Sequence, residues 1–176
     1  MELIDELFRF QIATKRLQLV LDVEESLLKR RAYSDQRRLE QILLNLMSNS
    51  IKFTFRGSVT FRITPEGDTG LKFEVEDTGV GISEASLPNL FKLFGKLQES
   101  ESINTTGCGI RLHISQQLVG RLGRQIEVKS RLNEGSNFWF VLPECLEAEL
   151  TEDVMETFRD DDEILTSSRG INNVPL

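Results

Sequence analysis

The spacing of apolar residues along this chain changes between the repeat of a helix and the alternation of a strand. The segments "LQLVLDVE" (17–24) and "SVTFRIT" (58–64) alternate apolar with polar or smaller residues, as half-buried strands do. Between them, residues 36–53 repeat their apolar side chains at helical spacing through Leu39, Leu43 and Leu46. Because helical and strand segments succeed one another, the chain has to pack a sheet against helices, which predicts an α/β fold.

The same pattern continues on both sides of these segments. Residues 2–14, 83–94 and 110–123 have the spacing of helices, and Ser34 and Asp35 are both placed to cap the helix over 36–53. Residues 71–77 form a further strand after the turn-rich "PEGDTG", and "QIEVKS" and "NFWFVL" form a final strand pair joined by "RLNEG". A strand pair joined by so short a turn is antiparallel, which argues against an all-parallel sheet.

The net charge of −7 is not spread evenly over the 176 residues. Residues 144–163 hold ten acidic residues and one basic residue, whereas residues 1–143 hold 18 acidic and 19 basic residues. We therefore predict one domain over residues 1–143, followed by an acidic and flexible tail or linker over residues 144–176. The nearly neutral body lacks the basic surplus of a general nucleic-acid binder, so no nucleic-acid partner is expected.

The apolar runs and the cysteines bear on location. No apolar run is long enough to cross a bilayer, and the acidic, amphipathic start "MELIDELF" is not a secretory leader. Cys108 and Cys145 give no disulfide framework and fit a reducing compartment. We expect a cytoplasmic domain that makes no membrane contact of its own, although a longer parent protein can be membrane-anchored.

The predicted helix over 36–53 carries two amides and an ammonium group on one face. Asn45 and Asn49 are four residues apart, and Lys52 follows one turn later. An amide oxygen suits Mg²⁺, which takes phosphate oxygens and water as its other ligands, and a lysine suits phosphate. The alternative is a set of buried polar groups that neighbouring backbone satisfies.

A carboxylate ends the predicted strand over 71–77. Period two places Asp77 on the same face as the apolar Phe73 and Val75, where an unpaired carboxylate is costly. The following Gly79 and Gly81 permit a tight turn and a close backbone approach. This arrangement suits the amino group of a flat heterocycle; the alternative is that Asp77 only caps the turn.

Two further motifs follow. "GCGIRL" (107–112) opens the last predicted helix with two glycines, and free amides at a helix N-terminus bind phosphate. It is neither a dinucleotide fingerprint nor a P-loop, so a flexible hinge is the alternative. In "LFKLF" (90–94), Phe91 and Phe94 lie directly before the polar residues 95–106, which we expect to form a loop; the pair is either core or the anchor of a mobile lid.

In combination and in this order, the motifs resemble the ATP-binding domain of sensor histidine kinases, in the superfamily shared with gyrase, the MutL repair proteins and the heat-shock chaperone of ninety kilodaltons. The resemblance covers roughly residues 1–143 and rests on "NLMSNSIKFT", "DTGVG", "LFKLF" and "GCGIRL", with support from "SDQRRLEQILLNL" and "NEGSNFWFVLP". It implies a two-layer open sandwich of a mixed sheet and three main helices, the Bergerat-type fold, with ATP held between a helix and a lid.

The resemblance also implies a set of nucleotide-binding residues: Asn45, Asn49, Lys52, Phe53, Asp77, Gly79, Gly81, Ile82, Phe91, Phe94, Gly107, Gly109 and Asn137. Asn49 is expected to coordinate the Mg²⁺ that bridges the phosphates, while Asn45 and Lys52 position the phosphate oxygens for catalysis. Asp77 is expected to accept from the adenine amino group, and Asn137 to supply a hydrogen bond near the adenine.

The remaining members have supporting roles in the resemblance. Phe53 lines the pocket, Gly79 and Gly81 lie beneath the base, and Ile82 packs nearby. The lid glycines, Gly107 and Gly109, let backbone amides meet the phosphates.

Two positions depart from the family pattern. Arg111 occupies the place of a third lid glycine, which leaves open a degenerate nucleotide-binding domain used only for regulation or docking. Asn45 stands where the gyrase branch has its glutamate base, so transfer to a protein is favoured over hydrolysis.

We expect that the phosphoacceptor histidine lies outside this sequence, because the one histidine here, His113, is expected to be an ordinary helix residue. The implied activity is therefore transfer of the γ-phosphoryl group of ATP to a histidine on a separate dimerisation module. A response-regulator receiver is a further partner if the parent protein is a hybrid kinase.

Overall fold

The structure is a computed structural model that describes residues 2–27, 35–67, 70–93 and 110–143. Its α-helices are α1 (Glu2–Lys15), α2 (Gln36–Phe53) and α4 (Ile110–Arg121), and its strands are β1 (Gln18–Val23), β2 (Ser58–Glu66), β3 (Gly70–Asp77), β4 (Glu127–Arg131) and β5 (Gly135–Pro143). Two short 3₁₀ turns, Glu25–Leu27 and Leu87–Asn89, complete the described elements. No described helix combines the length and the apolar character that a membrane span requires.

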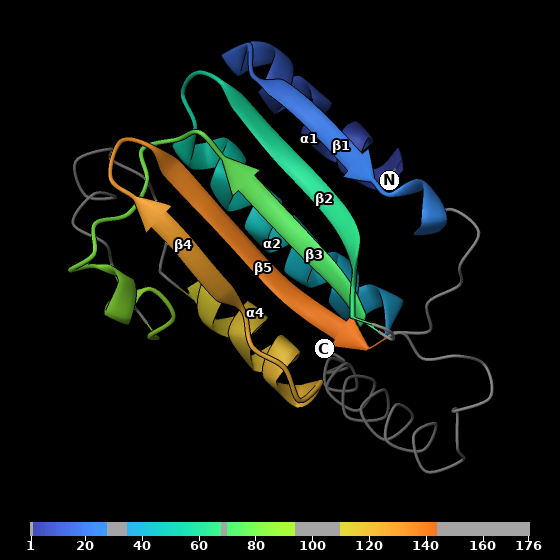
Figure 1. Cartoon of the computed structure of the whole chain (residues 1–176). Coiled ribbons are helices and arrows are strands. Elements are labelled where there is room, and N and C mark those ends of the chain that lie inside the picture. Colours follow the sequence, from blue (N-terminus) through green and yellow to red (C-terminus); the bar gives the residue numbers. More distant parts are fainter. Residues whose placement is uncertain (1, 28–34, 68–69, 94–109, 144–176) are drawn as a thin grey trace, which may run out of the picture.

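The strands form one mixed sheet in the order β1-β2-β3-β5-β4 (Figure 1). β1 pairs with β2 in parallel, and the pairs β2–β3, β3–β5 and β4–β5 are antiparallel. The parallel pair arises because α2 crosses over the sheet between β1 and β2, whereas short turns join the other sequence neighbours in the sheet. The predicted mixed sheet is confirmed.

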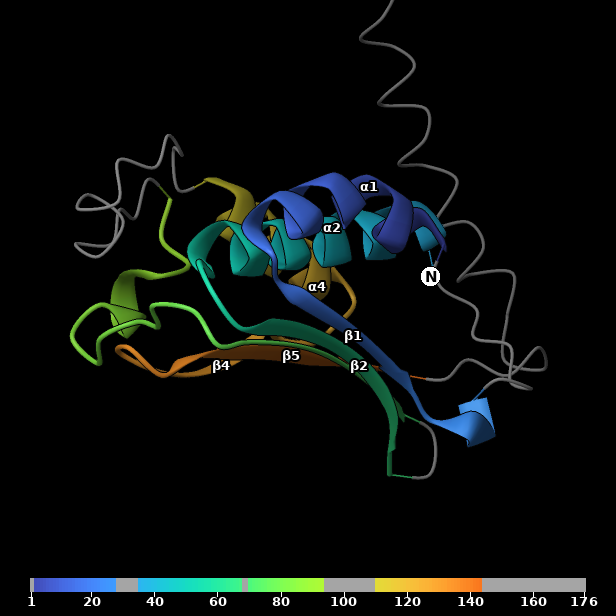
Figure 2. The same ribbon diagram turned by 90° about the horizontal axis from the view of Figure 1, so that it is seen from above.

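The three α-helices of the described residues lie on one face of this sheet, and none of them covers the other face (Figure 2). Alternate side chains of the strands point toward the helices and are buried there: Phe61, Val75 and Phe140 are at most 1 % exposed. From α2, Ile42 and Met47 enter the same core. The predicted two-layer open sandwich with three main helices is therefore confirmed.

Helix α2 begins where the sequence predicted. The carboxylate of Asp35 accepts a hydrogen bond from the backbone N–H of Arg38 at 3.1 Å and so satisfies one of the free amides of the first turn. The helix ends at Phe53; the next residue, Thr54, has an extended backbone, and its N–H still donates to the Ser50 carbonyl.

The predicted helix over residues 83–94 is wrong. Among residues 83–93 the structure has turns and one 3₁₀ turn, Leu87–Asn89, with Pro88 inside it. Proline lacks the N–H that would continue a longer helix from this point, and Leu87, Leu90 and Phe91 anchor the segment to the core. Strand β2 also contains a proline, Pro65. It lies beyond Ile63, the last residue of β2 that pairs with β1, so its missing N–H costs no hydrogen bond of the sheet.

Candidate functional site

The end of β3 meets the last turns of α2 at a buried carboxylate. Asp77 is the final residue of β3 and is 6 % exposed. The hydroxyl of Ser50, on α2, donates to its Oδ2 at 3.1 Å, and the backbone N–H of Gly79 donates to its Oδ1 at 2.9 Å. The helix, the strand and the glycine turn are thus joined through one acidic side chain.

Burial and hydrogen bonding shift the pKa of Asp77 in opposite directions. Burial raises the pKa of Asp77 above its ordinary value of 3.8, whereas the hydrogen bonds from Gly79, Ser50 and the backbone of Ser136 lower it, and the net shift is upward. A carboxylate oxygen can accept more than one hydrogen bond, so the contacts from Ser50, Gly79 and Ser136 do not exhaust the acceptor capacity of Asp77. This is the chemistry expected for binding an exocyclic amino group.

The two glycines after Asp77 are required by contacts within the protein itself. A Cβ atom at Gly79 would lie 2.6 Å from the carbonyl oxygen of Phe53, at the end of α2. Gly81 has a φ of +65°, and a Cβ atom there would lie 1.9 Å from the carbonyl oxygen of Arg131. The turn therefore packs directly on the end of α2 and on the β4–β5 hairpin, which fixes its position relative to Asp77.

Helix α2 carries the predicted amides and the lysine. The Asn45 amide donates from Nδ2 to the Ser115 hydroxyl of α4 at 3.0 Å, so one of its two N–H groups joins the two helices. Asn49 is half-buried one turn later, and the Lys52 ammonium lies 5.2 Å from the centre of the Phe53 ring. Asn49, Lys52 and Phe53 thus lie on the last turns of α2, next to Ser50 and its bond to Asp77.

Two further apolar members of the predicted set, Ile82 and Phe91, follow the glycine turn along the chain. Ile82 is 7 % exposed, and its N–H donates to the hydroxyl of Ser130 at 2.8 Å. Phe91 is half-buried and packs against the core; its carbonyl lies 2.9 Å from Nδ1 of His113 on α4. His113 thus links α4 to the Phe91 segment, a tertiary contact that its helical position did not predict.

Three predicted residues lie outside the described residues: Phe94, Gly107 and Gly109. Arg111, in contrast, is described, and its side chain is exposed on the first turn of α4. An exposed side chain at this position does not crowd the packed interior of the described part of the chain.

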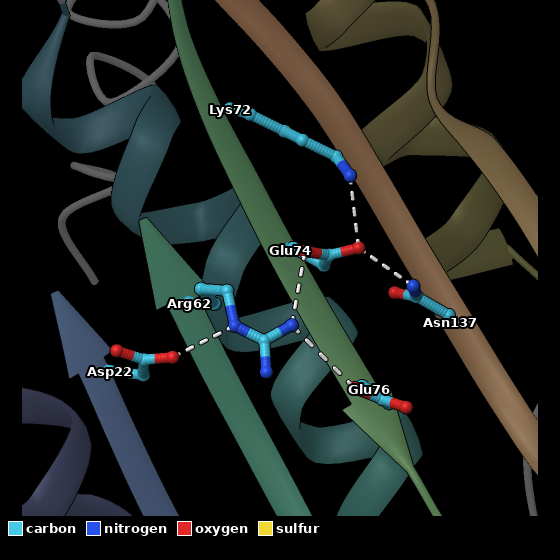
Figure 3. Close-up of polar contacts among 6 residues, drawn as sticks. All are labelled: Asp22, Arg62, Lys72, Glu74, Glu76 and Asn137. Atoms are coloured by element: carbon cyan, nitrogen blue, oxygen red, sulfur yellow. Dashed lines mark hydrogen bonds and ion pairs between the residues drawn. The ribbon is translucent and has the colours of Figure 1, made fainter. Parts of the chain in front are cut away.

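The hydrogen bond expected from Asn137 near the adenine stays a prediction, and the Asn137 side chain does not share a sheet face with Asp77. Asn137 points to the sheet face that the described helices leave uncovered, where its Nδ2 donates to Glu74 Oε1 at 2.7 Å (Figure 3). Asp77 faces the helices, and the residue paired with it on β5 is Ser136. Because neighbouring strand residues point to opposite faces, an offset of one residue moves the side chain to the other side of the sheet.

Sequence reasoning missed two residues at this site, Ser50 and Ser136. The alternation in β5 was sufficient to find Ser136, since it is in phase with the buried Phe138 and Phe140. Ser50 had a weaker signal, a small polar residue between the buried Met47 and Ile51 of α2. Its partner is 27 positions away, and no local pattern reveals such a pairing.

Comparison with known proteins leads to the same family as the sequence motifs. The profile of the family described as histidine kinase-, DNA gyrase B-, and HSP90-like ATPase matches residues 34–146. The chain is 42 % identical over 113 residues to the hybrid signal transduction histidine kinase B of Dictyostelium discoideum, covering 62 % of this chain and 6 % of that protein. It is 39 % identical over 129 residues to the circadian input-output histidine kinase CikA of Synechococcus elongatus, covering 73 % of this chain and 17 % of that one.

Two solved structures have the same fold. The crystal structure of full-length ShkA in complex with AMPPNP has a TM-score of 0.70 and 29 % identity, covering 81 % of this chain and 28 % of that one. The catalytic domain of the histidine kinase ThkA has a TM-score of 0.66 at 23 % identity, covering 81 % of this chain and 88 % of that one, and shows likeness of fold alone. The chain spans between 6 % and 17 % of the length of the two curated relatives described above.

Proposed function

The chain belongs to the family of histidine kinase-, DNA gyrase B- and HSP90-like ATPases, and we propose that it is the ATP-binding catalytic domain of a sensor histidine kinase. The parent kinase is of the hybrid or the simple type. The observation that carries the proposal is the buried Asp77, which accepts from Ser50 and Gly79 at the junction of α2, β3 and the glycine turn. In this proposal the domain covers residues 1–143, and residues 144–176 form an acidic tail or linker.

The first proposed step is recognition of the base. Asp77, held by Ser50 and the Gly79 amide, accepts a hydrogen bond from the amino group of adenine. Ile82 and the backbone of the Gly79–Gly81 turn lie beside the ring. Guanine carries a carbonyl oxygen at the corresponding ring position, so it would place an acceptor against a carboxylate, which is repulsive.

The second proposed step is placement of the phosphates. The amide and ammonium side chains on α2 fit ATP that carries a bound Mg²⁺. An amide oxygen is a ligand that Mg²⁺ accepts, and an ammonium group attracts phosphate. Asn49 would hold the Mg²⁺, and Lys52 and Asn45 would reach phosphate oxygens; when bound, the ion neutralises charge on the phosphates. Asn45 is also fixed to α4 through Ser115, so α4 and α2 would be held together around the phosphates.

The transfer itself needs a second module. We propose that an imidazole nitrogen of a histidine on a separate dimerisation module attacks the γ-phosphorus, and that the bond to the bridging oxygen breaks to release ADP. Asn45 has no group that can take a proton from water, so this position orients reactants and does not activate water. A receiver domain would be a later partner, and the domain would act in the cytoplasm.

Calorimetric titration tests the nucleotide site. Mg-ATP is expected to bind the parent chain and to bind more tightly than Mg-GTP. Asp77→Asn is expected to weaken ATP binding by roughly tenfold to a hundredfold, because a hydrogen bond to a charged group is lost. Arg111→Gly is expected to leave ATP affinity unchanged, since the side chain is exposed.

Phosphotransfer tests the reaction. With radiolabelled ATP and a supplied dimerisation module, label is expected on the histidine of that module and not as free phosphate. Failure of the parent chain to bind Mg-ATP at millimolar concentration would contradict the proposal. Binding restored only by Arg111→Gly would instead indicate the degenerate regulatory domain.

A further inference from the structure

A lysine outside the predicted site holds the end of helix α2. Lys15 is the last residue of α1, which lies alongside α2 on the same face of the sheet (Figure 2). Its ammonium group donates to three backbone carbonyl oxygens: those of Ile51 at 2.6 Å, Lys52 at 2.8 Å and Thr54 at 3.2 Å. An ammonium group has three donors, and here each of them meets a carbonyl at the end of α2.

These carbonyls are among the groups that a helix leaves without partners. The last four carbonyls of an α-helix have no N–H one turn ahead, and they carry the negative end of the helix dipole. At the end of α2, Lys15 takes the carbonyls of Ile51 and Lys52, and the carbonyl of Phe53 accepts from the N–H of Val80 at 3.2 Å. The last turn of α2 is thus fixed from two sides, by α1 and by the glycine turn.

The contact partly withdraws the Lys15 ammonium group from water. Burial lowers the pKa of Lys15, so the position is costly for an ammonium group, and the carbonyls of α2 offset that cost. The ammonium group also lies over the ring of the exposed Phe55, with Nζ 5.1 Å from the ring centre. The first residue after α1, Arg16, has a φ of 53°, which ends the helix at Lys15 and leads the chain into β1.

We propose that Lys15 is a positioning residue for the nucleotide site. By tying the last turn of α2 to α1, it holds Asn49, Ser50 and Lys52 in place, and through the Phe53–Val80 bond it holds the turn that contains Gly79. Lys15 itself does not touch the nucleotide. This inference rests on the proposed function for its effect on binding, whereas its effect on the geometry of the free chain can be measured without any nucleotide.

The test compares three variants of the full chain. Lys15→Met removes the charge and the donors but keeps the side-chain length, Lys15→Arg restores both, and Lys129→Met removes an exposed lysine from β4 on the other face of the sheet. Thermal unfolding first establishes a temperature at which all are folded. Should Lys15→Met not fold, Lys15→Gln, which is neutral but still a donor, replaces it with the same expected direction of change.

Two measurements then follow. In nitrogen-15 correlation spectra without nucleotide, Lys15→Met is expected to shift the Gly79 and Val80 amides and the side-chain amide of Asn49, while Lys129→Met does not. In calorimetry with Mg-ATP, Lys15→Met is expected to bind about tenfold more weakly, from loosening of charge-assisted hydrogen bonds, and Lys15→Arg to recover most of that loss.

Unchanged spectra at Gly79, Val80 and Asn49, or parent affinity in a folded Lys15→Met chain, would overturn the inference. If the parent chain binds no Mg-ATP, the proposed function fails, and the spectra still decide whether Lys15 positions this end of α2.

Discussion

At the scale of single residues, the charge state of Asp77 links stability to pH. Its raised pKa means that the folded chain binds this proton more tightly than the unfolded chain does. The free energy of unfolding should therefore decrease as the pH rises from the ordinary value of 3.8 to the raised value. Asp77→Asn has no such proton, so urea unfolding at several pH values should show the parent losing stability relative to this variant over that window.

Ser50 provides the matched comparison. Ser50→Ala removes a donor that lowers the pKa of Asp77, so the decrease in stability with rising pH should become steeper and extend to higher pH than in the parent. Parallel stability curves for the parent, Ser50→Ala and Asp77→Asn would contradict the assignment of this titration to Asp77.

At the scale of elements, the glycine turn is a structural joint whether or not nucleotide is bound. Gly81→Ala forces a side chain into a positive φ and against the Arg131 carbonyl, so it should lower the free energy of unfolding by about 2 kcal/mol or more. Gly120, inside α4, has open space within 4 Å of the place where a Cβ atom would lie, and Gly120→Ala should raise stability by roughly 0.5–1 kcal/mol. Urea unfolding of both variants measures the contrast, and equal effects would refute it.

At the scale of the whole molecule, a charged network crosses the uncovered face of the sheet (Figure 3). Arg62 on β2 reaches Asp22 on β1 at 2.9 Å and Glu74 on β3 at 3.3 Å, and Glu74 also accepts from Lys72 and from Asn137 on β5. Burial alone would raise the pKa of Glu74, but the hydrogen bonds from Asn137, Lys72 and Arg62 hold it below its ordinary value of 4.5. The network thus connects four strands where no described helix covers them.

Arg62→Met should destabilise the protein by about 1–2 kcal/mol at neutral pH, because it removes a partner from a carboxylate that is 7 % exposed. A lowered pKa gives Glu74 a stabilising contribution above pH 4.5 that is lost in acid, so the deficit of the variant should shrink as the pH falls below 4.5. Arg131→Met breaks a pair with Glu134 in which both side chains are exposed, so its effect should stay within about 0.5 kcal/mol in chemical denaturation. A larger effect at Arg131 than at Arg62 would contradict this account.

The sequence by itself determined the layer architecture, because that depends on local period. The helical repeat of residues 36–53 and the alternation of residues 58–64 and 71–77 decide which side chains are apolar on each face, whatever their partners are. The capping carboxylate of Asp35 and the placement of Asp77 on the apolar face of β3 followed from the same local rules. The helix predicted over residues 83–94, around Pro88, was wrong because a few apolar residues without a sustained repeat fit a helix and a 3₁₀ turn equally well.

Only the tertiary structure decided which distant groups meet. The Ser50–Asp77 and Asn45–Ser115 bonds join residues 27 and 70 positions apart, and no period within one segment encodes such a pairing. The same holds for Lys15, which resembles any lysine at the end of a helix until α1 is packed beside α2. A face is fixed by the repeat within one element, but a contact also requires the register and crossing of two elements, which are set when the whole core packs.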